Sequence, residues 1–326
     1  RTGHTSWTLT DVDFEATGPY LDVNTTTTTL TPASASTGTG VDITASATTG
    51  INGGDGFQTT DVGRLIKFNS GEAVITSRTS TTVVVCTITK AFANTDATVA
   101  FQLGTFSATT GFPKAVTFFE QRLIYGGTTS FPQTIFASQS GLFDNFDVDD
   151  SSASDAFIYT IASNRVNVIR SLAPARDLII FTAGGEFKVS RPTGEPLKPD
   201  NVNITRQTTY GSHTTQSVQI DDAIIFLQKQ RQKVRAFEFR FADDAFIAPD
   251  LTLLADQVTG TGLVDLDYAQ EPDRILFAAR DDGQLVGLTY LKDEKILAWH
   301  RQIIGGKAQS CTVTVTAFSD AVGRGR

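Results

Sequence analysis

The sequence predicts an all-β protein: a partial β-propeller with a small β-sandwich or barrel domain inserted ahead of its blades. A short apolar run that ends in a Gly or charged turn recurs, beginning at Arg122, Asp177, Asp222 and Arg274, about 50 residues apart. Such a run is typical of a buried strand entering a hairpin, and propeller blades of four strands have this size. The residues before these repeats differ in composition, which indicates a separate domain.

Residues 1–23 predict a linker or edge strand that enters from an earlier part of the protein. Acidic and apolar side chains alternate over residues 11–15, as in an exposed edge strand, and Gly18-Pro19 predicts a turn. The sequence contains no Met. We therefore expect a fragment or a processed chain, with the first blades of the propeller supplied by an N-terminal part that precedes Arg1.

Residues 24–106 predict a Thr-rich small β domain of about five to seven strands. Thr25–Thr29 is an unbroken run, and β-branched Thr favours extended backbone. Gly and Asp turns separate the strand candidates, which are 41–45, 64–68, 73–77, 82–89 and 98–103.

Residues 107–326 carry the propeller blades. The first contains a hairpin over residues 114–126 with its turn at Glu120-Gln121-Arg122. The later units span residues 166–189, 216–241 and 263–300, and residues 191–199 form a protruding loop. One helix is expected over Leu251–Asp256, with Asp250 as its N-cap and Gly260 after its end.

Charge and cysteine content limit the function classes. A net charge of −8 argues against a protein that grips duplex DNA, although it suits a surface past which nucleic acid slides. Cys86 and Cys311 each lie in a Val/Thr strand, so we interpret them as two buried free thiols, with a disulfide as the alternative. No apolar run approaches the roughly 18 residues of a membrane span.

Acidic clusters are the first candidates for chemistry. Asp147, Asp149 and Asp150 could hold Ca²⁺ but lack the ligand spacing of an EF-hand, which favours a solvated loop. Asp243-Asp244 and Asp281-Asp282-Gly283 are typical of hairpin turns rather than of paired catalytic carboxylates.

The other candidates are histidines and one basic, aromatic stretch. His4, His213 and His300 are scattered, and Ser212 beside His213 would point to the opposite face of a strand. The stretch 228–235 is rich in Lys and Arg and precedes Phe237, Phe239 and Phe241, which alternate as in a strand with one face in the core. A hairpin tip, a protein contact and a nucleic-acid contact remain open for it.

Several segments, in order, resemble the tail nozzle proteins of podoviruses, the tail tubular protein B family. The segments are 132–146, 207–212, 248–252, 282–290 and 298–301, and 61–66 resembles the start of that family's inserted β domain. The resemblance implies a homohexameric tube below the portal and adaptor rings, with a propeller in each subunit, through which genome DNA leaves. Compared with that family, we expect the first blades and the distal tip to be missing from this sequence.

The sequence therefore predicts a structural protein of the virion, located in the phage tail, that is not an enzyme. Its expected partners are copies of itself, a tail adaptor ring, tail fibres or spikes, and DNA in transit. We expect no cofactor, no metal and no catalytic residue. Two rivals remain: a propeller that binds a host-surface glycan or receptor, favoured by exposed Phe131 and Phe143, and a propeller hydrolase.

Overall fold

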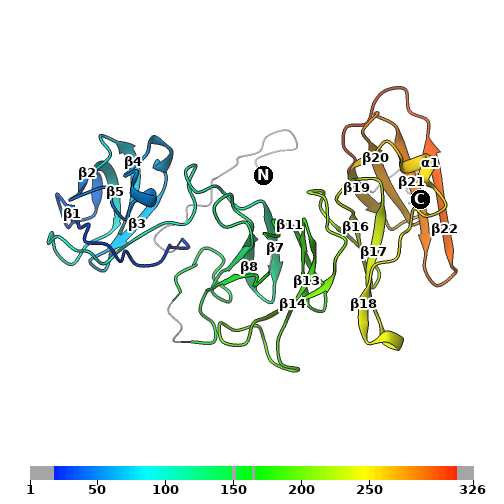
Figure 1. The fold of residues 1–326 in the computed structure, drawn as a ribbon, viewed down its shortest axis with the longest axis horizontal. Helices are drawn as coiled ribbons and strands as arrows, with labels where there is room; N and C mark the ends of the chain where they lie inside the picture. Colours follow the sequence, from blue (N-terminus) through cyan, green and yellow to red (C-terminus); the bar gives the residue numbers. More distant parts are fainter. Residues whose placement is uncertain (1–17, 149–151, 164–165, 314–326) are drawn as a thin grey trace, which may run out of the picture. The chain divides into compact units, whose positions relative to one another are not determined.

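The computed structural model describes residues 18–148, 152–163 and 166–313, and strands make up nearly all of its regular structure (Figure 1). These residues form two compact units. Unit 1 contains strands β1–β10 and the loop 190–203, and unit 2 contains β11–β22. The expected edge strand over residues 11–15 lies outside the described residues.

The Thr-rich residues of unit 1 form one six-stranded sheet in the order β1-β2-β5-β4-β3-β6. Leu30 in β1 pairs with Thr98, just before β6, so the two ends of this order meet and the sheet closes like a barrel. Its core includes Phe57, Phe68 and Phe101. The strands are β1 (Leu30–Pro32), β2 (Gly38–Ala45), β3 (Leu65–Phe68), β4 (Gly71–Arg78), β5 (Val83–Lys90) and β6 (Phe101–Leu103).

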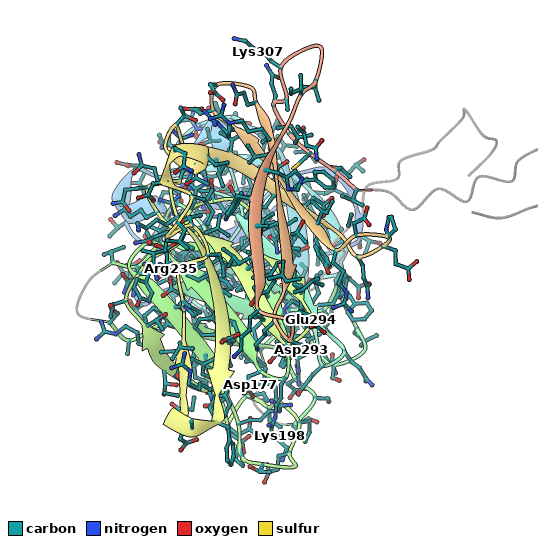
Figure 2. The ribbon with its side chains drawn as sticks, turned by 90° about the vertical axis from the view of Figure 1, so that its right-hand side faces the viewer. Asp177, Lys198, Arg235, Asp293, Glu294 and Lys307 are labelled. Atoms are coloured by element: carbon teal, nitrogen blue, oxygen red, sulfur yellow. The ribbon has the colours of Figure 1, made fainter. Side chains whose placement is uncertain are left out.

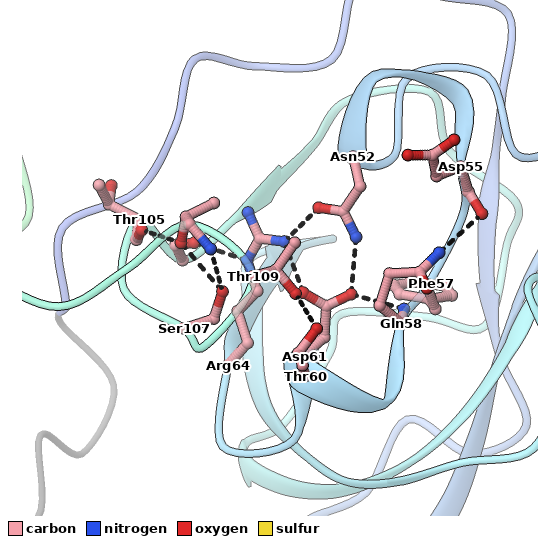
Figure 3. A network of polar contacts seen from close by, with 12 residues as sticks. Asn52, Asp55, Phe57, Gln58, Thr60, Asp61, Arg64, Thr105, Ser107 and Thr109 are labelled. Atoms are coloured by element: carbon pink, nitrogen blue, oxygen red, sulfur yellow. Dashed lines mark hydrogen bonds and ion pairs between the residues drawn. The ribbon is translucent and has the colours of Figure 1, made fainter. Parts of the chain in front are cut away.

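A buried polar network joins short turns and loops of this barrel domain (Figure 3). The Arg64 guanidinium donates to Gly104 O at 2.7 Å, to Asn52 Oδ1 at 2.7 Å and to Asp61 Oδ1 at 3.0 Å. Asp61 also accepts from the Gln58 backbone N–H at 2.8 Å. The side chains of Arg64 and Asp61 are 1% and 0% exposed, so each charge depends on the other for compensation.

A four-stranded antiparallel sheet follows in unit 1, in the order β10-β9-β8-β7. Glu120 and Gln121 have φ values of 47° and 60°, so the turn predicted at 120–122 is confirmed as a tight hairpin of the kind that needs two left-handed residues. Arg122 is buried and donates to the carbonyls of Ser138, Ala153 and Asp155. The strands are β7 (Ala115–Phe119), β8 (Arg122–Gly126), β9 (Thr134–Ala137) and β10 (Phe157–Thr160).

Unit 2 contains three more four-stranded sheets, each with its strands in chain order. One apolar cluster joins the first sheet to the second, around Phe181 and Phe226, and another joins the second to the third, around Ile225 and Leu276. Up-and-down four-stranded sheets packed face to face are propeller blades, so the predicted fold class is confirmed. The sheets are β11 (Ile169–Pro174), β12 (Leu178–Thr182), β13 (Gly185–Ser190) and β14 (Asn203–Thr208); β15 (Val218–Ile220), β16 (Ala223–Leu227), β17 (Val234–Arg240) and β18 (Ala245–Ile247); and β19 (Leu263–Ala269), β20 (Ile275–Arg280), β21 (Leu285–Leu291) and β22 (Ile296–Gln302).

The helix predicted over 251–256 is wrong in its position. The helix α1 spans Asp256–Thr259, and its N-cap residue, Ala255, makes no side-chain cap. Asp250 instead accepts from the backbone N–H of Thr252 at 2.9 Å, and this contact caps a turn. Asp250 also accepts a hydrogen bond from Lys233, which directly precedes β17.

Two further expectations about burial need correction. Phe237 is 1% exposed, but Phe239 and Phe241 are 46% and 90% exposed, so only the first of the three lies in the core. Phe239 lies near the end of β17, and Phe241 lies in the turn that follows it. The thiols of Cys86 and Cys311 are free, but Cys311 is half-buried rather than buried.

Glu186 on β13 carries a buried carboxylate whose effect on stability can be measured. It is fully buried, and its Oε1 has no hydrogen-bond partner among the described residues. Burial raises the pKa of Glu186, against the smaller opposing effect of the Thr208 hydroxyl and the Tyr210 backbone N–H. A raised folded-state pKa means that stability is full below the unfolded-state pKa and falls as pH rises through the folded-state value.

We therefore expect Glu186→Gln to gain stability relative to the parent chain as pH rises from about 4 to about 8, by on the order of 1 kcal/mol. Urea denaturation at each pH measures this difference. Glu294→Gln is the control, because Glu294 lies beside Asp293 at the exposed tip of the β21–β22 hairpin (Figure 2). An equal pH response in both variants would contradict a raised pKa at Glu186.

Candidate functional site: a cleft in unit 1

The candidate site is a cleft in unit 1 between the Thr-rich barrel and the outer strands of the first blade. Its volume is about 810 Å³, within the range of small-molecule sites. Barrel strands β3 and β6 and the segment before β1 form one wall, β9 and β10 form the other, and the loop after β9 contributes its inner surface. The lining includes Tyr20, Asp22, Lys67, Gln102, Thr105, Phe131, Phe146, Asp147, Phe157, Tyr159 and Asp200.

A lysine–aspartate pair joins the two walls. Lys67 Nζ on β3 donates to both carboxylate oxygens of Asp147, at 2.7 and 2.6 Å. The ammonium also lies 5.3 Å from the centre of the Tyr20 ring. The Lys67 and Asp147 side chains are 26% and 38% exposed, and a pair of this exposure contributes only about 0–1 kcal/mol. Ligand groups could therefore replace it at low cost.

Two residues that line this cleft carry buried hydroxyl groups. They are Thr105, which is 1% exposed, and Tyr20, which is 8% exposed. Burial, and then the nearby Glu72 carboxylate, raises the pKa of the Tyr20 phenol. The Glu72 carboxylate also accepts from the Tyr20 hydroxyl, so of the two groups only the Thr105 hydroxyl has no partner in the described residues. Buried polar groups without partners are rare in native structures and are often satisfied by water or a ligand.

The outer edge of the cleft is held by the loop 191–202. The Tyr159 hydroxyl donates to Pro199 O at 2.5 Å, and the Leu197 backbone N–H donates to Glu120 at 2.7 Å. Arg191 pairs with the same Glu120 carboxylate. The exposed carboxylate of Asp200 follows Pro199 directly, so the loop fixes an acceptor at the rim.

The predicted acidic loop is divided by the structure. Asp147 lies in the cleft with Lys67, whereas Asp149 and Asp150 lie outside the described residues. Within the described residues, no group of three or more His, Cys, Asp or Glu side chains is placed to hold a metal ion. In the described part of this loop, Asp147 therefore forms an ion pair.

The structure does not bring the other acidic and histidine candidates together. Asp282 accepts from Arg280 at 2.6 Å in the β20–β21 turn, and Asp244 adopts a φ of 47° in a turn, so both predicted turns are confirmed. His213 Nδ1 lies 2.9 Å from the Thr215 hydroxyl. Burial lowers the pKa of this imidazole, and nearby arginines lower it further. His4 lies outside the described residues.

Several cationic side chains of the stretch 228–235 are paired with other groups of the protein. Arg231 pairs with Asp281 at 3.3 Å and Lys233 with Asp250 at 2.7 Å. Arg235, labelled in Figure 2, lies 3.7 Å from the centre of the Tyr210 ring and donates to Ala248 O. These contacts favour the hairpin interpretation over a nucleic-acid contact.

The two aromatic candidates differ in exposure. Phe143 is 45% exposed and packs edge-on against Phe118, with ring centres 5.1 Å apart. Phe131 is only half-buried rather than exposed, and it lines the cleft. Sequence reasoning missed Tyr20, Lys67 and Thr105, because no motif marks them and only the fold brings them together.

None of the helices in the described residues is both long and apolar enough to cross a membrane. No protein-family model matches the chain, and no curated protein matches it. Solved structures resemble the chain at low sequence identity.

An auxiliary nutrient binding protein from Bacteroides thetaiotaomicron is 9% identical, with a TM-score of 0.35 over 91% of this chain and 72% of that one. A candidate 6-phosphogluconolactonase from Bacteroides uniformis is 13% identical, with a TM-score of 0.42 over 85% and 71%. BamB from Moraxella catarrhalis is 13% identical, with a TM-score of 0.32 over 58% and 48%. Because these TM-scores are low, the three likenesses assign no function to this chain.

Proposed function

We propose that this chain is a structural protein of a phage tail nozzle, which acts by assembly and by conducting DNA rather than by covalent chemistry. The observation that carries the proposal is the ordered series of segments, from 61–66 to 298–301, that resemble the tail tubular protein B family. The expected assembly is a homohexamer in the virion tail, in contact with an adaptor ring and with tail fibres or spikes.

The surface of the chain supports a role in assembly. Only 19% of the residues are charged, which leaves much of the surface to Thr, Ser and apolar groups. Large apolar side chains at Phe241, Leu253 and Leu254 are 90%, 68% and 86% exposed. Leu253 and Leu254 are adjacent in the chain, and contiguous apolar surface is typical of sites that contact other proteins. The net charge of −8 would keep DNA from adhering to a channel wall.

Light scattering with negative-stain imaging of the purified chain tests the proposal. We expect a closed ring of about six subunits around a central hole, since identical subunits in head-to-tail contact close into rings. A compact monomer, with or without an added adaptor ring, would overturn it.

A binding propeller is the second candidate, and the cleft in unit 1 is the observation that favours it. The cleft combines aromatic rings with carboxylates, an ammonium and hydroxyl groups, as sites for small polar ligands do. On this alternative the protein would recognise a glycan or a receptor on a host surface. A hydrolase has no comparable support, because the paired carboxylates named above lie in turns.

A further inference from the structure

We infer that Lys67 forms a proton-controlled latch across the cleft in unit 1, and that ionisation of Glu72 opens it. In the structure the Lys67 ammonium donates to both carboxylate oxygens of Asp147, which joins the barrel to the loop after β9. Ionised Glu72 competes for the same ammonium and weakens that pair. The inference concerns the opening of the cleft and does not depend on the tail assignment.

Glu72 lies opposite a lysine on each neighbouring strand of the barrel. Lys67 on β3 and Lys90 on β5 are its register partners. Ile66 and Ala73 face the core, so the side chains of Lys67 and Glu72, which alternate with them, point away from it. Side chains directly opposite each other have Cβ atoms about 4.5–5.5 Å apart. The Lys67 ammonium can therefore reach Glu72 as well as Asp147.

Burial favours the neutral form of Glu72. The residue is 2% exposed, and its Oε2 has no hydrogen-bond partner in the described residues. Burial raises the pKa of Glu72, and the Tyr20 hydroxyl and the two opposite lysines oppose this effect without cancelling it. The Asp147 carboxylate raises the same pKa further. Glu72 therefore stays protonated at a pH where an exposed glutamate, with a pKa of about 4.3, has already ionised.

The two carboxylates differ in how much each needs the ammonium. Asp147 is 38% exposed, so water solvates it when the pair opens. Ionised Glu72 is shut off from water, and a buried charge without a partner is costly. Lys67 therefore shifts toward Glu72 as pH rises through the pKa of Glu72, and its pair with Asp147 weakens.

The latch spans two parts of unit 1 that a short connection joins. Residues 104–114 link β6 of the barrel to β7 of the first blade. Asp147 is held to the blade, because its neighbour Phe146 is 1% exposed and stacks on Tyr125 with ring centres 5.4 Å apart. When Lys67 leaves Asp147, the barrel can therefore move away from the blade about this connection.

Double electron–electron resonance on the full chain tests the latch. Spin labels at Ser77→Cys on β4 and Val116→Cys on β7 report the separation of barrel and blade, because both positions are exposed. Cys311→Ser removes the half-buried thiol, and the buried Cys86 is inaccessible to the label. We expect one narrow distance distribution at about pH 5 and a broader one, shifted to longer distances, at about pH 8.5.

Three variants separate the latch from other effects of pH. Glu72→Gln keeps the shape of the side chain but cannot ionise, so we expect the narrow distribution at both pH values. Asp147→Asn removes the charge that holds the ammonium, so we expect the broad distribution at both. Asp42→Asn is the matched control, because Asp42 is exposed on β2 of the same barrel and does not line the cleft, and it should respond to pH as the parent does.

A distance distribution that does not change with pH in the parent chain would overturn the inference. An undiminished pH response in Glu72→Gln would assign the effect to another group and overturn it as well. The half-exposed site of Asp147 keeps the test decisive if Glu72→Gln fails to fold. A narrow distribution in Asp147→Asn at about pH 5 would show that this pair does not hold the cleft closed.

Discussion

Leu276→Asp is expected to unfold the last blade of unit 2. Leu276 on β20 is 0% exposed and packs in the cluster that joins the second and third sheets of that unit. An ionised carboxylate there would have no partner, and such a change costs at least about 4–5 kcal/mol. Because a domain is stable by only about 5–15 kcal/mol, we expect loss of most folded protein, measured by urea denaturation with circular dichroism.

Leu254→Asp is the matched control. The same substitution is made in the same unit, but Leu254 is 86% exposed and lies in the turn before α1. A surface change of this kind alters stability by about 0.5 kcal/mol or less. Equal stability of the two variants would contradict the packing of these two sheets around Leu276.

The sequence alone does not show which residues of β20 face this core. Phe277, the largest side chain of its apolar run, is only half-buried, whereas Leu276 and Ala278 face the core. The run 275–279 is apolar at every position, so alternation gives no signal for the inward face. A shift of one residue exchanges the two faces of a strand, and only packing against the next sheet decides between them.

The turns were easier to predict than the face of each strand that lies against the core, because local residues determine a turn. The hairpin at 120–122 and the Asp-Gly turn at 281–283 occur as predicted. Strand β1 was missed, since Leu30–Pro32 follows a Thr run, and its pairing with β2 and Thr98 is set by distant residues. The helix was misplaced because Asp250 suits a turn as well as a helix start.

The cleft could not have been predicted from the sequence. Tyr20, Lys67, Thr105, Asp147 and Tyr159 come from segments far apart in the chain, and none of them belongs to a motif. Asp147 was noticed only as part of an acidic run, for which the sequence suggested solvent. Its partner Lys67 lies 80 residues away, so the pair follows from the fold alone.

The ion pair of the barrel gives the second large effect. We expect Asp61→Ala to destabilise unit 1 by about 3–5 kcal/mol, because it leaves the Arg64 charge buried without compensation. Burial already lowers the pKa of Arg64, and Asp61 opposes that effect. Arg64→Leu should cost a similar amount, since it leaves the Asp61 carboxylate with only Asn52 and the Gln58 backbone N–H. Urea denaturation measures both.

The double variant Asp61→Ala/Arg64→Leu separates pairing from packing. Removing both charges leaves neither uncompensated, so its loss of stability should be well below the sum of the single losses. Lys198→Ala is the control in the same unit, because its pair with Glu195 is exposed and should leave the denaturation midpoint unchanged. If the double variant lost the full sum, the two side chains would act independently, and the network would stabilise the barrel through its backbone contacts, such as Arg64 to Gly104 O, rather than through charge compensation.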